Sequence, residues 1–266
     1  MRRFSADYLR RTRAGLWSSR AALDALDLPD RDRVLDVGCG SGEFTRVLDE
    51  EAGDAEVIGV DADPELLVAA REETGLPVVA GDATRLPFGD GAADLVACQA
   101  LLVNLPRPDA AVREFHRVAA DAVAAVEPDN ADVAVESTVD REVDLERRVR
   151  EAYLEGVETD VALGDRTVEA FEAAGLVGVT TRRHYHRKVI EPPYDEGDLQ
   201  DATRKATGAG LADHETELKR AVGDEYDDLR AAWREMGREV VAAMRAGTYR
   251  RAEVVPFDVT VGHVPE

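Results

Sequence analysis

A short apolar strand runs directly into a glycine-rich turn and then a helix in the segment Val34–Phe44, which reads VLDVGCGSGEF. Its three glycines, Gly38, Gly40 and Gly42, stand at alternate positions, where they let the backbone turn tightly and approach a ligand that side chains would block. The helix that follows presents free backbone N–H groups at its N-terminus, and these favour anionic groups. The segment therefore predicts a nucleotide-like ligand at the end of a strand.

The spacing of this turn separates it from dinucleotide-binding turns. The chain has G-x-G-x-G followed by Glu43, whereas the pattern G-x-G-x-x-G would need glycine at that position. The sequence thus argues against NAD as the ligand, and a nicotinamide-dependent oxidoreductase is the least favoured of the enzyme classes considered.

Two more segments place acidic residues after neighbouring strands. The segment VIGVDAD ends in Asp61, where a carboxylate can hydrogen-bond the two vicinal hydroxyls of a ribose. The segment AGDATRLPFGDGAADLV places Asp82 and Ala83 just after the next strand. Together with the glycine turn, these segments predict that one edge of a sheet is built to hold a nucleoside.

Residues 33–127 alternate short Val/Ile/Leu/Ala runs with amphipathic segments, a pattern typical of βαβ units around a parallel sheet. Pro64 and Pro108 stand where the first turn of a helix tolerates proline. We predict strands at Arg33–Val37, Glu56–Asp61, Val78–Ala80, Ala93–Cys98 and Ala122–Val126, and helices near Gly42–Glu51, Pro64–Glu73 and Pro108–Val118.

The flanking segments are mostly helical, and no Ser/Gly linker or internal repeat divides the chain of 266 residues, which predicts a single domain. The expected elements are one or two amphipathic helices in Tyr8–Leu26 over the edge of the sheet, helices at Val139–Tyr153 and Val168–Ala174, an extended segment Val177–Ile190, a polar helical block Asp195–Arg245 and a last strand Val254–Val261.

In their order along the chain, the glycine turn, the strand-end acid and the GDA and LPF segments resemble the class I S-adenosylmethionine-dependent methyltransferases, especially the branch acting on small molecules. The resemblance is close over residues 30–130 and continues loosely through FEAAGL at 171–176 and the last strand. It implies an α/β fold with a Rossmann-like, doubly wound, seven-stranded sheet, N-terminal helices and a helical insertion before the last strand.

The resemblance also implies how the outer segments are arranged. Segment 177–190 would pair with 254–261 as an antiparallel hairpin, and residues 195–247 would be the insertion between them. We expect this insertion, the N-terminal helices and residues 139–160 to form a lid over the acceptor site.

The resemblance assigns roles to individual residues, with S-adenosylmethionine as the cofactor. Backbone atoms of the glycine turn would contact its methionine part, one strand-end acid would hold the ribose, and the third segment would hold the adenine. The residues are Gly38, Cys39 and Gly40 for the methionine part, Asp36 for orienting the turn or the amino group, Asp61 for the ribose hydroxyls, Ala62, Asp82 and Ala83 for adenine, and Gln99 next to Cys98 for the sulfonium side.

Methyl transfer from a sulfonium needs mainly alignment of the acceptor and exclusion of water, and it needs a base only if the acceptor must lose a proton. No decisive catalytic residue is recognisable in the sequence. Weak candidates are Glu127 and Asn130 in VEPDN, which can also be turn residues around Pro128, and Tyr153, which can also be a core residue.

Charge sets the expected environment of the chain. Against 33 Lys and Arg stand 55 Asp and Glu, a net charge of −22, and only three basic residues are lysines. This bias resembles proteins of salt-accumulating halophiles, because concentrated salt screens the repulsion among the excess carboxylates.

Two cysteines, outside any metal-binding pattern, predict neither a disulfide framework nor a metal site. With no apolar stretch of spanning length and no signal-peptide pattern, we predict a cytoplasmic protein.

The first twenty residues are the one basic segment. Their arginines could meet an anionic acceptor, the cofactor carboxylate or RNA phosphates, or pair with acids of the chain itself. The alternatives to a small-molecule enzyme are therefore an RNA-modifying methyltransferase, disfavoured by the overall negative charge, and a non-enzymatic cofactor-binding or interaction protein. The arginines are Arg2, Arg3, Arg10, Arg11, Arg13 and Arg20.

Overall fold

The computed structural model describes residues 5–13 and 15–265, apart from the side chains of Asp7 and Arg11. Arg2 and Arg3 of the basic segment lie outside these residues. The chain folds into two compact units, and that it forms a single domain stays a prediction. The sheet unit comprises Met1–Asp129, Ala162–His184 and Phe257–Glu266; the helical unit comprises Asn130–Val161 and Tyr185–Pro256.

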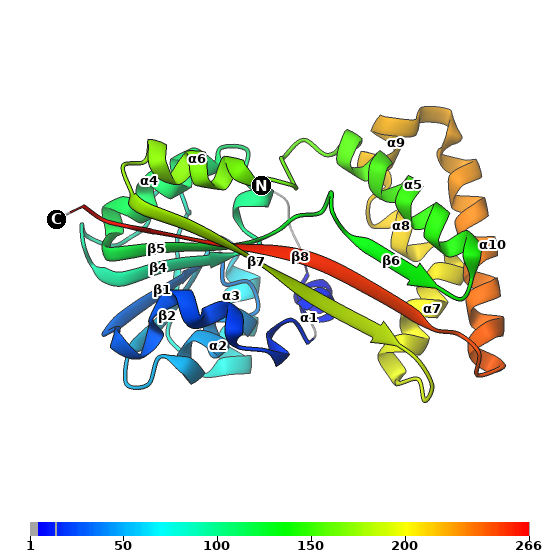
Figure 1. Cartoon of the computed structure of the whole chain (residues 1–266), viewed down its shortest axis with the longest axis horizontal. Helices are drawn as coiled ribbons and strands as arrows, with labels where there is room; N and C mark the ends of the chain where they lie inside the picture. Colours follow the sequence, from blue (N-terminus) through cyan, green and yellow to red (C-terminus); the bar gives the residue numbers. More distant parts are fainter. Residues whose placement is uncertain (1–4, 14, 266) are drawn as a thin grey trace. The chain divides into compact units, whose positions relative to one another are not determined.

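Five parallel strands form the centre of the sheet unit, in the order β3-β2-β1-β4-β5 (Figure 1). β8 continues the sheet antiparallel to β5, and β7 pairs with β8. This order confirms the doubly wound arrangement, in which the carboxyl ends of β1, β2 and β4 meet at one edge. The strands are β1 (Arg33–Val37), β2 (Glu56–Asp61), β3 (Val78–Ala80), β4 (Ala93–Gln99), β5 (Ala119–Pro128), β7 (Val177–Ile190) and β8 (Arg251–His263).

The predicted strands all form, and the first three and the extended segment 177–190 keep their predicted bounds. β4, β5 and β8 are longer than predicted. The expectation of seven strands is wrong by one, because Ala134–Ser137 forms β6, which pairs with the first residues of β8. Its alternation of exposed and half-buried residues gave no apolar run to detect.

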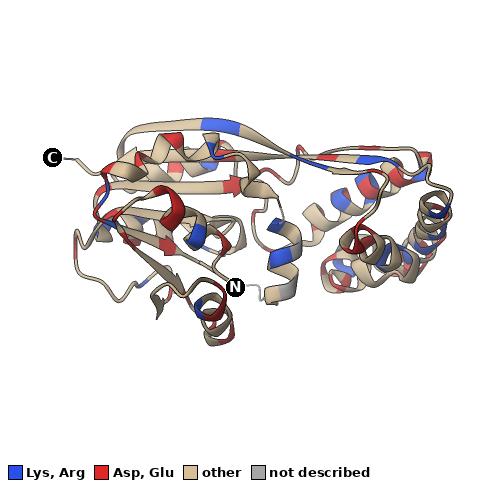
Figure 2. Ribbon diagram, turned by 90° about the horizontal axis from the view of Figure 1, so that it is seen from below, with Lys and Arg blue, Asp and Glu red and all other residues tan. Residues whose placement is uncertain are grey.

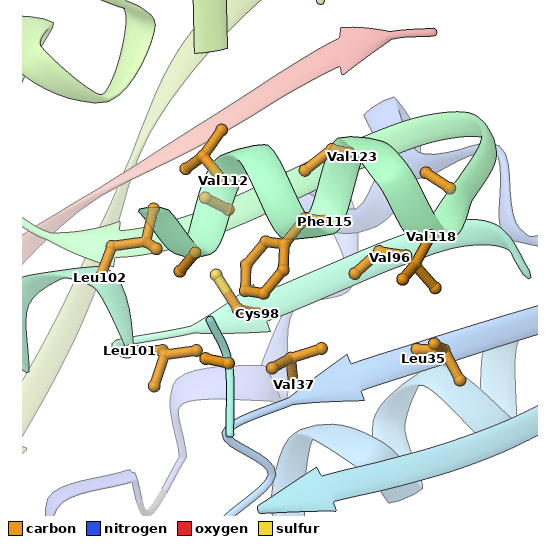
Figure 3. Packing of buried hydrophobic residues seen from close by; sticks show 14 of the residues in the cluster. Leu35, Val37, Val96, Cys98, Leu101, Leu102, Val112, Phe115, Val118 and Val123 are labelled. Carbon is orange, nitrogen blue, oxygen red and sulfur yellow. The ribbon is translucent and has the colours of Figure 1, made fainter. Parts of the chain in front are cut away.

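Helices cover both faces of the central strands because neighbouring strand residues point to opposite faces. Leu35 and Val37 pack with Phe115 of α4 (Pro108–Val118) and Phe171 of α6 (Asp165–Ala173), as Figure 3 shows for α4. Val34 packs on the other face with residues of α2 (Glu43–Glu51). α3 (Pro64–Thr74) packs beside α2 and β2.

The N-terminal segment was predicted to form one or two amphipathic helices, and it forms one α-helix. This helix, α1 (Ala6–Arg13), is followed by three short 3₁₀ turns, η1 (Leu16–Ser18), η2 (Ala21–Leu26) and η3 (Leu28–Asp30). Left-handed backbone at Gly15 (φ 74°) precedes η1, extended backbone at Ser19 ends η1, and left-handed backbone at Asp27 (φ 48°) separates η2 from η3. Leu23, Leu26 and Leu28 pack into the face that α2 covers, rather than over the edge of the sheet.

The helical unit has its own apolar core, built on Tyr226, Leu229, Trp233 and Met236 of its longest helix. Segments 139–160 and 195–247, which the sequence analysis assigned to a lid, contribute together to this core. The helices of the unit are α5 (Asp140–Gly156), α7 (Glu196–Thr207), α8 (Ala209–Ala212), α9 (Glu215–Val222), η5 (Gly223–Glu225) and α10 (Tyr226–Arg245).

A buried ionic cluster joins the elements of the helical unit. Glu146 of α5 accepts hydrogen bonds from Lys205 of α7 at 2.7 Å and from Arg251 of β8 at 2.6 Å. Burial raises the pKa of Glu146, but these two cations outweigh it and lower the pKa to about 2. Glu142, with no exposed surface, bonds Lys205 and the Tyr249 hydroxyl.

No described helix has the length and apolar character needed to cross a bilayer.

Candidate cofactor site

The glycine turn is fixed by the end of β2. The backbone N–H groups of Gly38 and Cys39 both donate to the carbonyl of Val60, at 2.7 and 3.0 Å. One carboxylate oxygen of Asp61 accepts from Gly40 N–H at 2.9 Å, and the other accepts from Asp63 N–H at 2.8 Å. Asp61 therefore joins the turn after β1 to the turn after β2, at the strand edge where the sequence analysis placed it.

The turn requires glycine for its backbone and for its close contacts. Gly38 and Gly40 have φ of 75° and 57°, in the left-handed region that glycine favours. A Cβ atom on Gly38 would lie 2.8 Å from the Leu101 side chain, and one on Gly40 would lie 2.7 Å from Leu9 of α1. α1 thus packs directly on the glycine turn, a contact that the sequence did not predict.

Asp36 supplies a buried acceptor just before the turn. One of its oxygens accepts a hydrogen bond from the Thr45 hydroxyl of α2 at 2.6 Å. The other oxygen, Oδ1, is buried and has no partner among the described residues. Burial raises the pKa of Asp36 to about 7, although the Thr45 hydrogen bond lowers it. A cationic group bound next to Oδ1 would both pair it and hold it ionised.

Gln99 is the matching polar group at the end of β4. β1 and β4 are in register with Asp36 beside Ala97, so Gln99, two residues further, lies on the same face as Asp36. Its side-chain oxygen accepts a hydrogen bond from the Trp17 indole N–H at 3.2 Å, and its buried amide nitrogen has no partner among the described residues. Trp17 stacks on Phe44 of α2 with ring centroids 4.9 Å apart.

The predicted adenine residues follow β2 and β3. Ala62 is exposed directly after Asp61, and Ala83 is buried in the core with Leu86. Asp82 is exposed, and one of its oxygens accepts from the backbone N–H and the hydroxyl of Thr84 at 2.8 and 2.7 Å. These two hydrogen bonds lower the pKa of Asp82, so its carboxylate is ionised and held in one orientation.

Both cysteines near the site are buried thiols. Burial raises the pKa of Cys39 and of Cys98, and nearby carboxylates raise each further. Cys98 packs with Phe115 and Val37 (Figure 3). Thiols held protonated in this way act as small apolar side chains rather than nucleophiles. Within residues 5–13 and 15–265, no cluster of His, Cys, Asp and Glu suits a metal ion.

The three weak catalytic candidates have well-defined structural contacts. Glu127 is buried and accepts hydrogen bonds from the backbone N–H groups of Leu101, Leu102 and Val103 at 2.9–3.2 Å, so it holds the turn after β4. Asn130 and Tyr153 belong to the helical unit. The Asn130 side chain donates to the Val161 carbonyl at 2.6 Å, and Tyr153 packs against the core of that unit.

The described arginines of the basic segment pair with acids of the sheet unit. Arg10 lies 3.3 Å from Glu73, Arg13 lies 3.9 Å from Glu43, and Arg20 pairs with Glu50 and Glu51. Figure 2 shows the basic positions on the helix next to the N-terminus amid acidic positions spread over the chain. The structure supports the pairing of these arginines within the chain, one of the four possibilities left open by the sequence.

Three contributors to the site escaped the sequence analysis, namely Trp17, Thr45 and Leu9. Thr45 could have been found, because the third residue of a helix that follows such a turn faces back to the strand. Trp17 and Leu9 could not, because each reaches the site across an irregular segment whose path no periodic pattern specifies.

Known proteins resemble this chain in part of its sequence and in its fold. Residues 35–124 match the family described as a methyltransferase domain. The demethylmenaquinone methyltransferase of Deinococcus radiodurans is 40% identical over 87 residues, 31% of this chain and 36% of that protein. The demethylmenaquinone methyltransferase of Thermus thermophilus is 38% identical over 109 residues, 39% of this chain and 49% of that protein. The matches thus span half or less of these relatives.

Two solved structures share the fold over most of this chain. A candidate methyltransferase of Bacillus halodurans aligns over 93% of this chain and 100% of its own, with a TM-score of 0.54 and 15% identity. The YcgJ protein of Bacillus subtilis aligns over the same shares, with a TM-score of 0.53 and 18% identity. At these identities the likeness concerns the fold alone.

Proposed function

We propose that the chain, whose residues 35–124 match a methyltransferase domain, binds S-adenosylmethionine and transfers its methyl group to a small-molecule acceptor. One observation carries the proposal. At the carboxyl ends of β1 and β2, Asp61 holds Gly40 N–H at 2.9 Å while the buried Asp36 Oδ1 has no partner among the described residues. A strand edge with a fixed carboxylate, a glycine turn and an unpaired buried acceptor fits a ligand with a ribose and an ammonium group.

Each residue has a role that its chemistry supports. Asp61, fixed by two backbone donors, would accept the ribose hydroxyls with its remaining lone pairs. Asp36 Oδ1 would accept the ammonium group, and Gln99 would present its unpaired amide N–H. Ala62, Asp82 and Ala83 would surround the adenine, and the backbone of Gly38, Cys39 and Gly40 would contact the methionine part.

When bound, S-adenosylmethionine supplies a methyl group activated by a sulfonium. The chain's own contribution is then orientation, because an aligned acceptor reacts without a large entropic loss. Glu127 fixes the turn after β4 beside Gln99, and Trp17 fixes the Gln99 side chain. No described residue is assigned as a base, since one is required only for an acceptor that must lose a proton.

Small acceptors form the proposed substrate class. Demethylmenaquinone, which the Deinococcus and Thermus relatives are named for, is the first compound to test. An RNA acceptor is disfavoured, because the net charge of −22 repels a polyanion. We further propose a cytoplasmic, high-salt setting for the protein.

The proposal is tested by methyl transfer from radiolabelled S-adenosylmethionine to a panel of small acceptors and to total RNA, in concentrated KCl. We expect label in at least one small acceptor, and its loss when Asp61 is replaced by asparagine. Label found in RNA alone would contradict the small-molecule assignment. No label in any acceptor, from a protein that does not bind the cofactor, would contradict the enzyme assignment.

A further inference from the structure

A cavity of about 250 Å³ in the sheet unit lies between α1, η1, α2 and the end of α3. Four arginines contribute to its lining, Arg10, Arg13, Arg20 and Arg46, together with two glutamates, Glu43 and Glu73. Counted over these residues the lining is positive by two, on a chain whose net charge is −22. The lining residues are thus positive on balance, while Glu50 and Glu51, which pair with Arg20 and Arg46, are not among them.

The cavity adjoins the cofactor site within the sheet unit. Arg13 Nη1 would lie 3.4 Å from a Cβ atom on Gly40 of the glycine turn. Trp17, which lines the cavity, donates its indole N–H to Gln99 at 3.2 Å. A ligand in the cavity would thus be one residue away from the end of β4, where the proposed function places the sulfonium side of the cofactor.

The arginine pairs leave room for an anion. Arg20 Nη1 is buried and has no hydrogen-bond partner among the residues that the structure describes. The pairs Arg10–Glu73 and Arg46–Glu50 are about half exposed, and such pairs contribute little to stability. Guanidinium groups bind carboxylate and phosphate through two parallel N–H donors, so an anion could replace these exposed partners.

Resting on the proposed function, we infer that this arginine cavity binds an anionic group, a carboxylate or a phosphate, carried by the acceptor. A volume of about 250 Å³ holds a charged group and a few neighbouring atoms rather than a whole substrate. The flat ring of Trp17 offers a surface for the part of the acceptor that extends toward Gln99. The cofactor has a carboxylate of its own, but the N-terminus of α2 offers it backbone N–H groups, whereas those of Gly38, Cys39 and Gly40 are bonded within the protein.

The test uses inorganic phosphate as the probe, titrated by calorimetry at constant ionic strength into the free protein and into its complex with S-adenosylhomocysteine. The informative pair of variants is Arg46→Gln and Arg113→Gln. Arg46 lines the cavity and pairs with Glu50 at 3.0 Å; Arg113 lies on α4 and pairs with Asp109 at 2.7 Å. Both are i,i+4 helix pairs of similar exposure, so the two variants lose the same charge and the same kind of pair.

We expect saturable phosphate binding to both forms of the wild-type protein. Arg46→Gln should weaken it about tenfold, the loss of one charge-assisted hydrogen bond, and Arg113→Gln should leave it unchanged. If phosphate binds the free protein but not the complex with S-adenosylhomocysteine, the cavity belongs to the cofactor carboxylate and the inference is wrong. The inference is also wrong if phosphate does not bind the free protein, or if both variants lose the same amount of phosphate affinity. Failure of S-adenosylhomocysteine itself to bind would instead overturn the proposed function, while phosphate alone still reports on the anion site.

Discussion

Asp61 has two tasks at the residue scale in the proposed function, because the carboxylate that fixes Gly40 would also accept the ribose hydroxyls. Replacing it with asparagine keeps the shape and removes the charge. We expect Asp61→Asn to weaken binding of S-adenosylhomocysteine by about 1.5–3 kcal/mol, the range for hydrogen bonds to a charged group. Calorimetric titration measures the change.

The control for this variant is Asp54→Asn, which removes an exposed carboxylate from the turn before β2, at the other end of the strand. Its affinity for S-adenosylhomocysteine should equal that of the wild type. Equal affinity of Asp61→Asn and the wild type would mean that the ribose lies elsewhere.

Asp36 makes stability depend on pH. Its pKa in the folded protein is raised by burial from 3.8 to about 7, so the folded state binds this proton more tightly than the unfolded state. The unfolding free energy contributed by Asp36 is therefore largest at low pH and falls as pH rises from about 4 to 7, by up to about 1.4 kcal/mol per unit. Denaturant unfolding of wild type and Asp36→Asn across this range measures the slope.

Glu127 shares this behaviour, since burial raises its pKa to about 7 despite three backbone donors. We therefore expect Asp36→Asn to flatten the slope without abolishing it. A slope identical in the two proteins would show that Asp36 is ionised in the folded state at all these pH values.

The sequence predicted that the candidate site residues which directly follow a strand lie together at one edge of the sheet. Gly38, Gly40 and Asp61 follow strands that one apolar run each defines, so their shared edge could be inferred from strand ends alone. The unpaired oxygen of Asp36 and the contact between Trp17 and Gln99 depend on side chains that meet from distant segments. Contacts between such distant segments cannot be predicted from a local sequence pattern.

At the scale of elements, one glycine sets how closely two helices of the helical unit pack. A Cβ atom on Gly237 of α10 would lie 2.3 Å from the backbone nitrogen of Ala206 in α7. Because backbone cannot move aside as a flexible side chain can, Gly237→Ala should force the two helices apart. We expect a loss of about 1–3 kcal/mol of unfolding free energy, the range for overpacked cores.

Gly210→Ala is the matched substitution. Gly210 lies in α8 of the same unit, and a Cβ atom there meets nothing within 4 Å. The change should be neutral or slightly stabilising, because alanine is the better helix former. Chemical denaturation of both variants gives the comparison, and a Gly237→Ala protein as stable as the wild type would rule out the close helix contact.

The elements themselves were predictable where apolar periodicity is strong. Pro108–Val118 forms a helix with its predicted bounds, because proline starts it and its apolar residues repeat on one face. Residues 16–26 did not form one helix, because extended backbone at Ser19 interrupts them, a conformation that the residue type does not indicate. β6 was missed since its four residues carry no apolar face.

At the scale of the whole molecule, a charge of −22 should make stability rise with salt. Raising KCl from 0.1 to 1 M shortens the Debye length from about 10 to about 3 Å and so screens repulsion among the carboxylates. The added salt also weakens exposed ion pairs such as Arg113–Asp109, but each of these pairs contributes little to the stability of the fold. We expect the thermal midpoint to rise over this range.

The control is the thermal midpoint measured over the same KCl range near the isoelectric point, where the chain has no net charge for salt to screen. The rise of the midpoint with KCl should be smaller there. A midpoint that falls with KCl at neutral pH would show that ion pairs outweigh the net charge, and it would remove the argument for a high-salt setting.

The central claim is that the edge formed by β1, β2 and β4 holds S-adenosylmethionine. Calorimetric titration of S-adenosylmethionine, S-adenosylhomocysteine and NAD into the protein in about 2 M KCl, where charge repulsion is screened, tests it directly. We predict micromolar binding of the first two at one site per chain and no heat of binding from NAD. A folded sample that binds neither S-adenosyl compound would contradict the account.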